Sequence, residues 1–169
     1  ISNDDELAQK IRYLINFGIK NSTEIAYLGT NAKMNEFEAA MGLCVLDDIE
    51  NIKEKRKIII ENYREELKDL VQFQKQNENA SENYSYFPIV LKNEEQLLKV
   101  QKALNDENIF PRRYFYPSLD TLEYIEPKQE CKISRDISKR ILCLPVYVEL
   151  DFDNQRKIIY IIKEKLSGW

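Results

Sequence analysis

Apolar residues recur at steps of three or four in the first part of the chain, which is the spacing of an amphipathic α-helix. The pattern begins after Asp4 and Asp5, either of which can cap a helix, and Gly18 ends it. Its apolar face consists of Leu7, Ile11, Leu14 and Ile15. Residues 19–33 are rich in Asn, Ser, Thr and Gly, a composition typical of a loop. We therefore predict a short helix followed by a loop.

A longer helical pattern runs from Asn35 to Leu70. Asn35 and Glu38 have the spacing of a capping box, in which each side chain bonds to the backbone N–H of the other residue. The apolar positions are Val45, Ile49, Ile52, Ile59, Tyr63, Leu67 and Leu70. An unbroken helix of this length would measure roughly 54 Å at about 1.5 Å per residue. We therefore expect a bend, with Gly42 as its candidate site.

Strand and helix patterns alternate in the second half of the chain. Residues 94–108 have a helical pattern, Ser134 can cap a short helix that ends at Leu142, and Asp151 can cap a last helix. The inward face of that last helix is predicted to be Phe152, Ile158, Ile159, Ile162 and Leu166. Strands are predicted for residues 84–91, 109–116 and 144–148. This order predicts an α+β fold with a small antiparallel sheet covered by helices, to which the long helix connects an earlier segment.

Composition and charge narrow the function classes. With 43% hydrophobic and 32% charged residues, the composition is that of a soluble globular protein. The purely apolar stretches are far shorter than the roughly 20 residues that span a bilayer. The 25 basic and 29 acidic residues give a net charge of -4, which argues against nucleic-acid binding through phosphate neutralisation. We expect a cytoplasmic location, because no signal-peptide pattern is present, and neither a membrane nor a nucleic acid as partner.

The residue types that the chain lacks exclude several kinds of metal-binding and catalytic site. The chain has no histidine, which removes imidazole metal ligands and Ser-His or Cys-His nucleophile pairs. Cys44, Cys131 and Cys143 have no C-x-x-C spacing and are predicted to be reduced and structural. The four glycines do not form a phosphate-loop motif. We therefore expect no metal site and no hydrolase triad.

Two segments contain residues suited to ligand binding. Residues 29–33 (Gly-Thr-Asn-Ala-Lys) directly precede a predicted helix, where free N–H groups and an ammonium favour phosphate, but an ordinary capping loop has the same composition. Residues 112–117 (Arg-Arg-Tyr-Phe-Tyr-Pro) form either an amphipathic strand or a sugar or nucleotide contact built from rings and guanidinium groups. Spacing alone leaves both alternatives open in each segment.

Several short runs follow one another in a characteristic order. The first three are Ile-Asn-Phe-Gly at 15–18, Gly-Thr-Asn-Ala-Lys-Met at 29–34 and Glu-Phe-Glu-Ala-Ala-Met-Gly-Leu at 36–43. The later ones are Lys55-Arg56 ahead of Tyr63, Ile109 with the segment at 112–117, Leu144-Pro145-Val146-Tyr147, and the helix after Asp151. This order resembles the C-terminal half of the DegT/DnrJ/EryC1/StrS sugar aminotransferases, and the resemblance covers essentially all 169 residues.

The resemblance implies the small C-terminal domain of a type I aminotransferase fold, in a homodimer. Residues 1–33 would end the large pyridoxal-phosphate domain and form an interface loop, 34–70 the long connecting helix, and 71–169 the small α+β domain. Asn31 would contact the cofactor phosphate of the other subunit, and Lys33 replaces a residue that is often Arg in the family. The residues implied to line the sugar-nucleotide pocket are Arg113, Tyr114, Phe115 and Tyr116.

The implied reaction is transfer of an amino group from glutamate to a nucleotide-linked keto sugar, with pyridoxal 5'-phosphate as cofactor. The sequence of residues 113–116 most resembles that of family members that act on dTDP- or UDP-linked 4-keto-6-deoxyhexoses. No lysine here lies in the family's Schiff-base motif, so the resemblance implies no catalytic residue in this chain and no activity of the chain alone.

Two hypotheses follow from that absence. The chain is either a portion of a full aminotransferase or a stand-alone, non-catalytic module for sugar-nucleotide binding or dimerisation. A stand-alone module would need a polar surface where the large domain is missing. The segment concerned is apolar at Phe17, Ile19, Ile25, Tyr27 and Leu28, which favours the first hypothesis.

Overall fold

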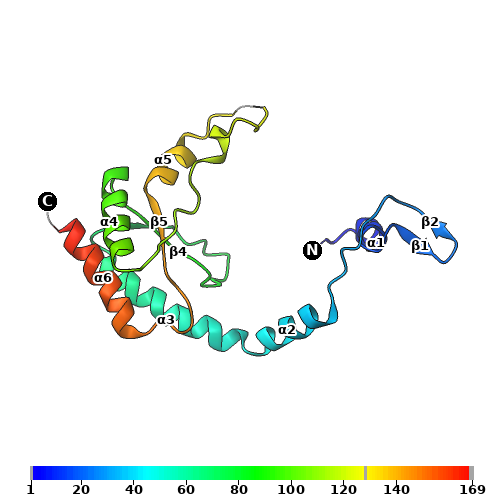
Figure 1. Ribbon diagram of the computed structural model, residues 1–169, viewed down its shortest axis with the longest axis horizontal. Coiled ribbons are helices and arrows are strands. Elements are labelled where there is room, and N and C mark those ends of the chain that lie inside the picture. The colour runs from blue at the N-terminus through cyan, green and yellow to red at the C-terminus, as the bar shows by residue number, and fades with distance from the viewer. Residues whose placement is uncertain (1, 128, 168–169) are drawn as a thin grey trace. The chain divides into compact units, whose positions relative to one another are not determined.

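The computed structural model describes residues 2–127 and 129–167. It contains two compact units: unit 1 ends at Ile49 and unit 2 begins at Glu50. Helices occur together with small antiparallel sheets, so the predicted α+β fold is confirmed (Figure 1). Within the described residues, no helix is long and apolar enough to cross a lipid bilayer.

Unit 1 begins with helix α1 (Asp5–Leu14), which has the predicted N-cap because Asp4 Oδ1 accepts a hydrogen bond from Leu7 N at 3.0 Å. The prediction of a loop for residues 19–33 was wrong in part. A hairpin forms there from β1 (Ile19–Asn21) and β2 (Glu24–Ile25). Asn21 Oδ1 accepts from Thr23 N at 3.0 Å, so the Asn-Ser-Thr run makes a tight turn between two strands that are too short for a period-two pattern.

The long helical pattern corresponds to two helices, α2 (Glu36–Asp47) and α3 (Ile49–Leu67). The capping box is confirmed: Glu38 N donates to Asn35 Oδ1 at 2.9 Å, and Asn35 N donates to Glu38 Oε2 at 3.2 Å. The proposed bend at Gly42 was wrong, since α2 continues through it. The interruption lies at Asp48, where φ is -102° and ψ is 2°. Its N–H donates to Val45 O at 3.3 Å, a tighter closure than the α-helical bond.

Unit 2 contains a three-stranded antiparallel sheet in the order β3-β4-β5. Its strands are β3 (Gln72–Phe73), β4 (Phe87–Val90) and β5 (Ile141–Leu144). Only β4 lies within a predicted strand. Residues 109–116 form no strand beyond a single bridge from Arg112 to Cys143, because Pro111 has no N–H to donate. The strand predicted at 144–148 was wrong as well, since β5 ends before Pro145.

Helices α4 (Glu94–Asp106), α5 (Lys132–Arg140) and α6 (Phe152–Leu166) complete unit 2, with a 3₁₀ turn at Leu119–Thr121. Asp151 caps α6 as predicted, accepting from Asn154 N at 2.7 Å. Ser134 is not a cap, because α5 begins before it and ends before Leu142. Phe152 was predicted to face inward but is 60% exposed, since it lies in the first turn of α6, beyond the sheet-covering face.

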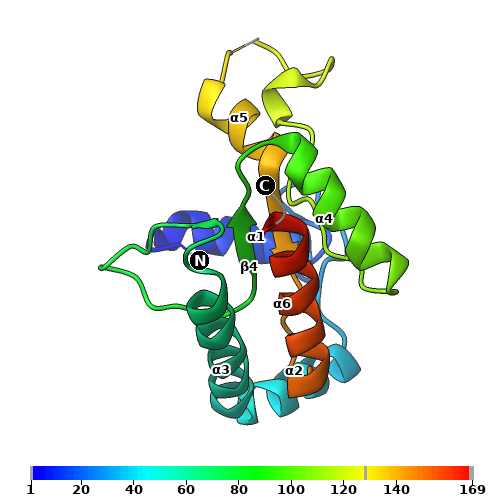
Figure 2. The same ribbon diagram turned by 90° about the vertical axis from the view of Figure 1, so that its left-hand side faces the viewer.

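The core of unit 2 lies between one face of the sheet and helices α3, α4 and α6. Figures 1 and 2 show α4 and α6 side by side on the same side of β4 and β5. The Tyr63 and Phe87 rings stack with centroids 5.4 Å apart. Gln155 is buried with its amide satisfied: Nε2 donates to Ile59 O at 2.7 Å, and Oε1 accepts from Asn62 Nδ2 at 2.9 Å. The core therefore combines apolar packing with a paired polar group.

Two leucines of α4 test this core. Leu104 is fully buried, and Leu98 is 50% exposed. We expect Leu104→Ala to lower the free energy of unfolding by about 2–5 kcal/mol, because it removes buried methyl groups and leaves a cavity. Leu98→Ala on the same helix should cost far less. Urea denaturation followed by circular dichroism measures both, and equal losses would contradict the packing described here.

Candidate functional site

A backbone pairing in unit 1 brings together two segments that the sequence analysis singled out. Phe17 N donates to Thr30 O at 3.1 Å, and Ala32 N donates to Ile15 O at 3.0 Å. These bonds flank the antiparallel bridge between Asn16 and Asn31. The two asparagines therefore form a non-hydrogen-bonded pair, the arrangement in which opposing side chains approach most closely.

Lys33 joins this pair. Its Nζ donates to Asn16 Oδ1 at 2.8 Å and lies 4.9 Å from the centroid of the Phe17 ring. Within residues 2–127 and 129–167, no carboxylate forms an ion pair with Lys33. The predicted residues Asn31 and Lys33 are thus brought to one place, and both are exposed. Asn16 was missed as a site residue, because only its backbone pairing with Asn31 shows that it belongs there.

Two glycines permit this close approach. Gly18 has a φ of +76°, and a Cβ there would lie 1.7 Å from Tyr27 O. A Cβ on Gly29 would lie 2.2 Å from Gly18 N. No side chain fits at either position without moving backbone, so both glycines are needed for the pairing.

The chemistry of this group suits a phosphate. Among residues 2–127 and 129–167, the ammonium of Lys33 has only a neutral amide oxygen and an aromatic face as partners, and the exposed Asn31 amide offers further N–H donors. A phosphate near neutral pH carries about -1.5 to -2 charges and presents only acceptor oxygens. The residues present therefore fit the phosphate of pyridoxal phosphate as one part of a larger site.

In the fold, the side chains of the second predicted segment, residues 112–117, fall into two separate groups. Arg113 turns toward α4 and α5, where Nη2 donates to Glu94 Oε1 at 2.7 Å and to Lys139 O at 3.1 Å. Its guanidinium carbon lies 3.8 Å from the centroid of the Tyr116 ring, and the side chain is only 15% exposed. Arg113 and Tyr116 thus form one group that is anchored within unit 2.

Tyr114 and Phe115 form a different group. Their rings stack at 4.8 Å, and Tyr86 meets the Tyr114 ring edge-on at 5.5 Å. Arg112 Nη1 donates to the Tyr114 hydroxyl. Arg112 belongs to the segment 112–117 that the sequence analysis singled out, although the resemblance implied only residues 113–116 for the pocket. Tyr86 was not predicted to lie here, and no sequence signal links it to this segment.

A buried carboxylate fixes the chain directly after this segment. The side chain of Asp120 is 7% exposed and accepts hydrogen bonds from Cys131 N at 2.9 Å, the Ser118 hydroxyl, and Arg135 Nε at 2.6 Å. These bonds lower the pKa of Asp120 to about 2. Ser118 is itself 4% exposed and shares a hydrogen bond with Ser134 at 2.7 Å. The cluster ties the 3₁₀ turn, which directly follows residues 112–117, to α5.

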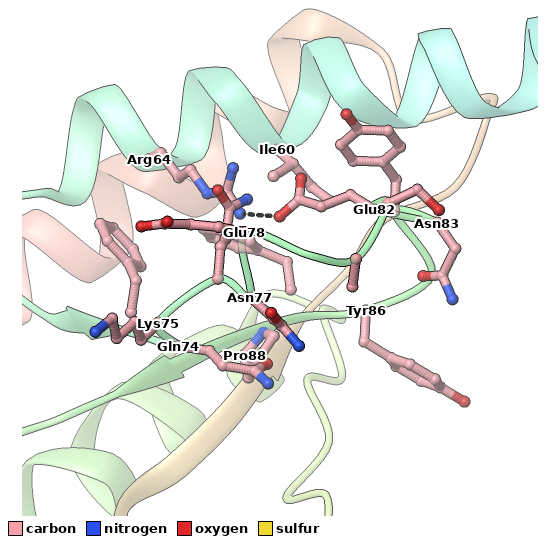
Figure 3. Close-up of a pocket in the computed structure, with 16 residues that line it drawn as sticks. Ile60, Arg64, Gln74, Lys75, Asn77, Glu78, Glu82, Asn83, Tyr86 and Pro88 are labelled. Carbon is pink, nitrogen blue, oxygen red and sulfur yellow. Dashed lines mark hydrogen bonds and ion pairs between the residues drawn. The ribbon is translucent and has the colours of Figure 1, made fainter.

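A cleft of about 470 Å³ lies between α3 and the loop that joins β3 to β4 (Figure 3). Arg64 and Glu82 form an ion pair across it at 2.8 Å, and Lys75 and Glu78 also line it. These opposite charges balance, so the cleft has no net attraction for an anion. Tyr86 lies at its edge with the ring directed away from α3, which places the cleft next to the Tyr114 group.

The sequence of this chain matches the model of one protein family. The family model of the DegT/DnrJ/EryC1/StrS aminotransferases matches residues 1–163. A dTDP-4-amino-4,6-dideoxy-D-glucose transaminase of Shigella dysenteriae is 34% identical over 97% of this chain and 47% of its own length. A GDP-perosamine synthase of Escherichia coli O157:H7 is 27% identical over 79% of this chain and 36% of its own.

Solved structures show the same fold. A DegT DnrJ EryC1 StrS aminotransferase from Brucella abortus superimposes with a TM-score of 0.87 at 24% identity, over 99% of this chain and 46% of that one. DesI in the presence of its TDP-sugar product gives a TM-score of 0.87 at 28% identity, over 99% and 45% of the two chains. The chain spans about half the length of the curated relatives it matches.

The Asp120 cluster predicts a pH dependence of stability. The carboxylate is stabilised in the folded state, so its contribution is complete above the ordinary pKa of 3.8 and is lost as the pH falls toward about 2. We expect Asp120→Asn to destabilise the protein at pH 7 and to cost progressively less between pH 4 and pH 2. Urea denaturation at several pH values measures this, with the exposed Asp69→Asn as control. A cost that does not change with pH would contradict a role for the charge.

Proposed function

This chain belongs to the DegT/DnrJ/EryC1/StrS aminotransferase family, and we propose that it is the C-terminal portion of an enzyme that transfers an amino group from glutamate to a nucleotide-linked keto sugar. The observation that carries the proposal is the 34% identity, over nearly the whole chain, to a transaminase of a dTDP-linked 4-amino-4,6-dideoxyglucose. DesI, with its TDP-sugar product, is a further relative at 28% identity. We therefore propose a dTDP-linked 4-keto-6-deoxyhexose as substrate.

The family uses pyridoxal phosphate, which when bound supplies the electron sink for moving an amino group between two carbon skeletons. In the proposed reaction glutamate becomes 2-oxoglutarate, and the keto carbon of the sugar becomes an amino carbon. Asn31 and Lys33 would hold the cofactor phosphate, with Asn31 donating from its amide and Lys33 supplying positive charge. Asn16 would orient Lys33 through the 2.8 Å hydrogen bond to its ammonium.

The sugar nucleotide would lie against residues 113–116. Tyr114 and Phe115 offer exposed ring faces, and Arg113 with Tyr116 holds the segment on α4 and α5. We assign no catalytic residue within the chain, because none of its lysines lies in the family's Schiff-base motif. That lysine would come from outside these 169 residues.

The domain organisation is part of the proposal. Residues 1–33 would complete the large domain, 34–70 would connect the domains, and 71–169 would form the small domain of a homodimeric enzyme. Exposure in unit 1 supports this: Leu28 is 100% exposed, Ile25 74% and Phe37 89%. A stand-alone binding module would leave these apolar side chains in water, whereas further parts of an enzyme would cover them.

The proposal is tested by assaying the enzyme that contains this chain with glutamate and dTDP-4-keto-6-deoxyglucose. We expect equal amounts of 2-oxoglutarate and a dTDP-amino sugar, identified by mass spectrometry. Borohydride reduction should trap the cofactor on a lysine of the longer protein and on none of the 169-residue chain. Absence of product with dTDP-, UDP- and GDP-linked keto sugars would overturn the substrate class, and a stoichiometric adduct on the short chain would overturn the assignment of the lysine.

The phosphate contact gives a separate prediction. A hydrogen bond to a charged group contributes about 1.5–3 kcal/mol, so Asn31→Ala should raise the dissociation constant of pyridoxal phosphate by about ten- to hundredfold. Absorbance titration of the apoenzyme measures this. Asn79→Ala removes an exposed amide from the loop between β3 and β4 and should have no effect. Equal affinities of the Asn31 and Asn79 variants would remove Asn31 from the cofactor site.

A further inference from the structure

We propose that Glu94 is a positioning residue: its carboxylate holds the Arg113 side chain against α4 and α5, and this contact fixes the path of residues 113–116. Arg113 then anchors the segment and does not itself contact the substrate. The inference rests on the proposed function, which places the sugar nucleotide beside residues 113–116. It deepens that function by assigning a role to a side chain that lies outside the segment.

Glu94 and Arg113 form an ion pair that is partly withdrawn from water. Glu94 Oε1 accepts a hydrogen bond from Arg113 Nη2 at 2.7 Å, and the two side chains are 35% and 15% exposed. A short, charge-assisted hydrogen bond with this little surrounding water contributes more than an ion pair on the open surface does. The pair therefore links the first turn of α4 firmly to the segment.

The same guanidinium has two further contacts. Nη2 also donates to Lys139 O at 3.1 Å, in the last turn of α5, and the guanidinium carbon lies 3.8 Å from the centroid of the Tyr116 ring. Arg113 thus connects the segment to two helices and, through Tyr116, to the other end of the segment. An arginine with these partners has little capacity left for a ligand.

Glu94 is not needed to cap its own helix. Asn93 is the N-cap of α4, and its Oδ1 accepts a hydrogen bond from Gln96 N at 2.9 Å. An acidic residue in the first turn also interacts favourably with the helix dipole, but Glu95 supplies the same charge one position later and is exposed. The feature that distinguishes Glu94 from Glu95 is the contact with Arg113.

This contact separates the anchored side chains of the segment from the others. Backbone hydrogen bonds to β5 at 2.8 and 3.2 Å fix Arg112. The Arg113 side chain is fixed on α4 and α5, whereas the rings of Tyr114 and Phe115 stack on each other in a separate group. Loss of the Glu94 carboxylate would remove one of the two acceptors of Arg113 Nη2 and allow the segment several conformations.

The inference is tested with the enzyme that contains this chain, assayed with glutamate and dTDP-4-keto-6-deoxyglucose. We expect Glu94→Gln to raise the KM for the sugar nucleotide by about tenfold, because a small displacement of a positioning segment has a large effect. The KM for glutamate should not change, because glutamate has no nucleotide to place beside the segment. Partial unfolding would instead lower kcat for both substrates and leave each KM unchanged, because it only reduces the amount of active enzyme.

Glu95→Gln is the matched control, because it removes the same charge from the same helical turn and should leave both KM values unchanged. Glu94→Asp, which keeps the carboxylate on a shorter side chain, should lie between the wild type and Glu94→Gln. The double variant Glu94→Gln/Arg113→Gln should raise the KM no further than the larger single effect, since both changes remove the same contact. If the two single effects multiply instead, Arg113 contacts the substrate itself and the role of Glu94 is wrong.

Hydrogen exchange measured by mass spectrometry reports on the segment without any substrate. In Glu94→Gln, exchange of a peptide that covers residues 112–117 should be about tenfold faster, because a charge-assisted hydrogen bond is lost, and in Glu95→Gln it should be unchanged. If the segment loosens in an enzyme that transaminates no keto sugar nucleotide, the positioning role stands and the proposed function is wrong. If the enzyme is active while Glu94→Gln keeps the wild-type KM and exchange, the function stands and Glu94 has no such role.

Discussion

Burial of one face of the sheet under α3, α4 and α6 is the constraint on which the arrangement of unit 2 depends. The alternation of side chains along a strand turns Phe87 and Ile89 into this core. Tyr86 directly precedes Phe87 and faces the opposite way, toward water. On β5, Leu142 and Leu144 are buried in the core, and Cys143 between them pairs with Arg112 through backbone hydrogen bonds at 2.8 and 3.2 Å. The same core therefore positions both Tyr86 and the segment that begins at Arg112.

Unit 1 depends on a different constraint, which is close approach of backbone to backbone. Gly18 and Gly29 lack the side chains that would keep the two segments apart, so residues 15–17 and 30–32 can exchange hydrogen bonds. That pairing sets Asn16 opposite Asn31, and Lys33 donates a hydrogen bond to the Asn16 side chain. The polar group thus results from local backbone geometry and not from a hydrophobic core.

Charge compensation distinguishes residues that hold the structure from residues that are free to meet a ligand. Arg113 pairs with Glu94, Arg135 with Asp120, and Arg64 with Glu82. Lys33 and Arg112 have only neutral partners among the described residues. Lys33 lies beside the Asn16–Asn31 pair, and Arg112 lies beside the stacked rings of Tyr114 and Phe115.

The sequence by itself determined the features that depend on nearby residues: the α+β class, the caps at Asp4, Asn35 and Asp151, and the inward face of α6 from Ile158 to Ile162. It also pointed to Asn31, Lys33, Tyr114 and Phe115, whose segments are contiguous. Only the tertiary structure decided the break at Asp48, the strands β3 and β5, and the irregular path after Pro111, because these depend on pairing with distant segments. The same holds for the positions of Asn16 opposite Asn31 and of Tyr86 beside Tyr114. Within residues 2–127 and 129–167, Arg113 and not Arg112 pairs with a carboxylate, because packing brings Glu94 to Arg113.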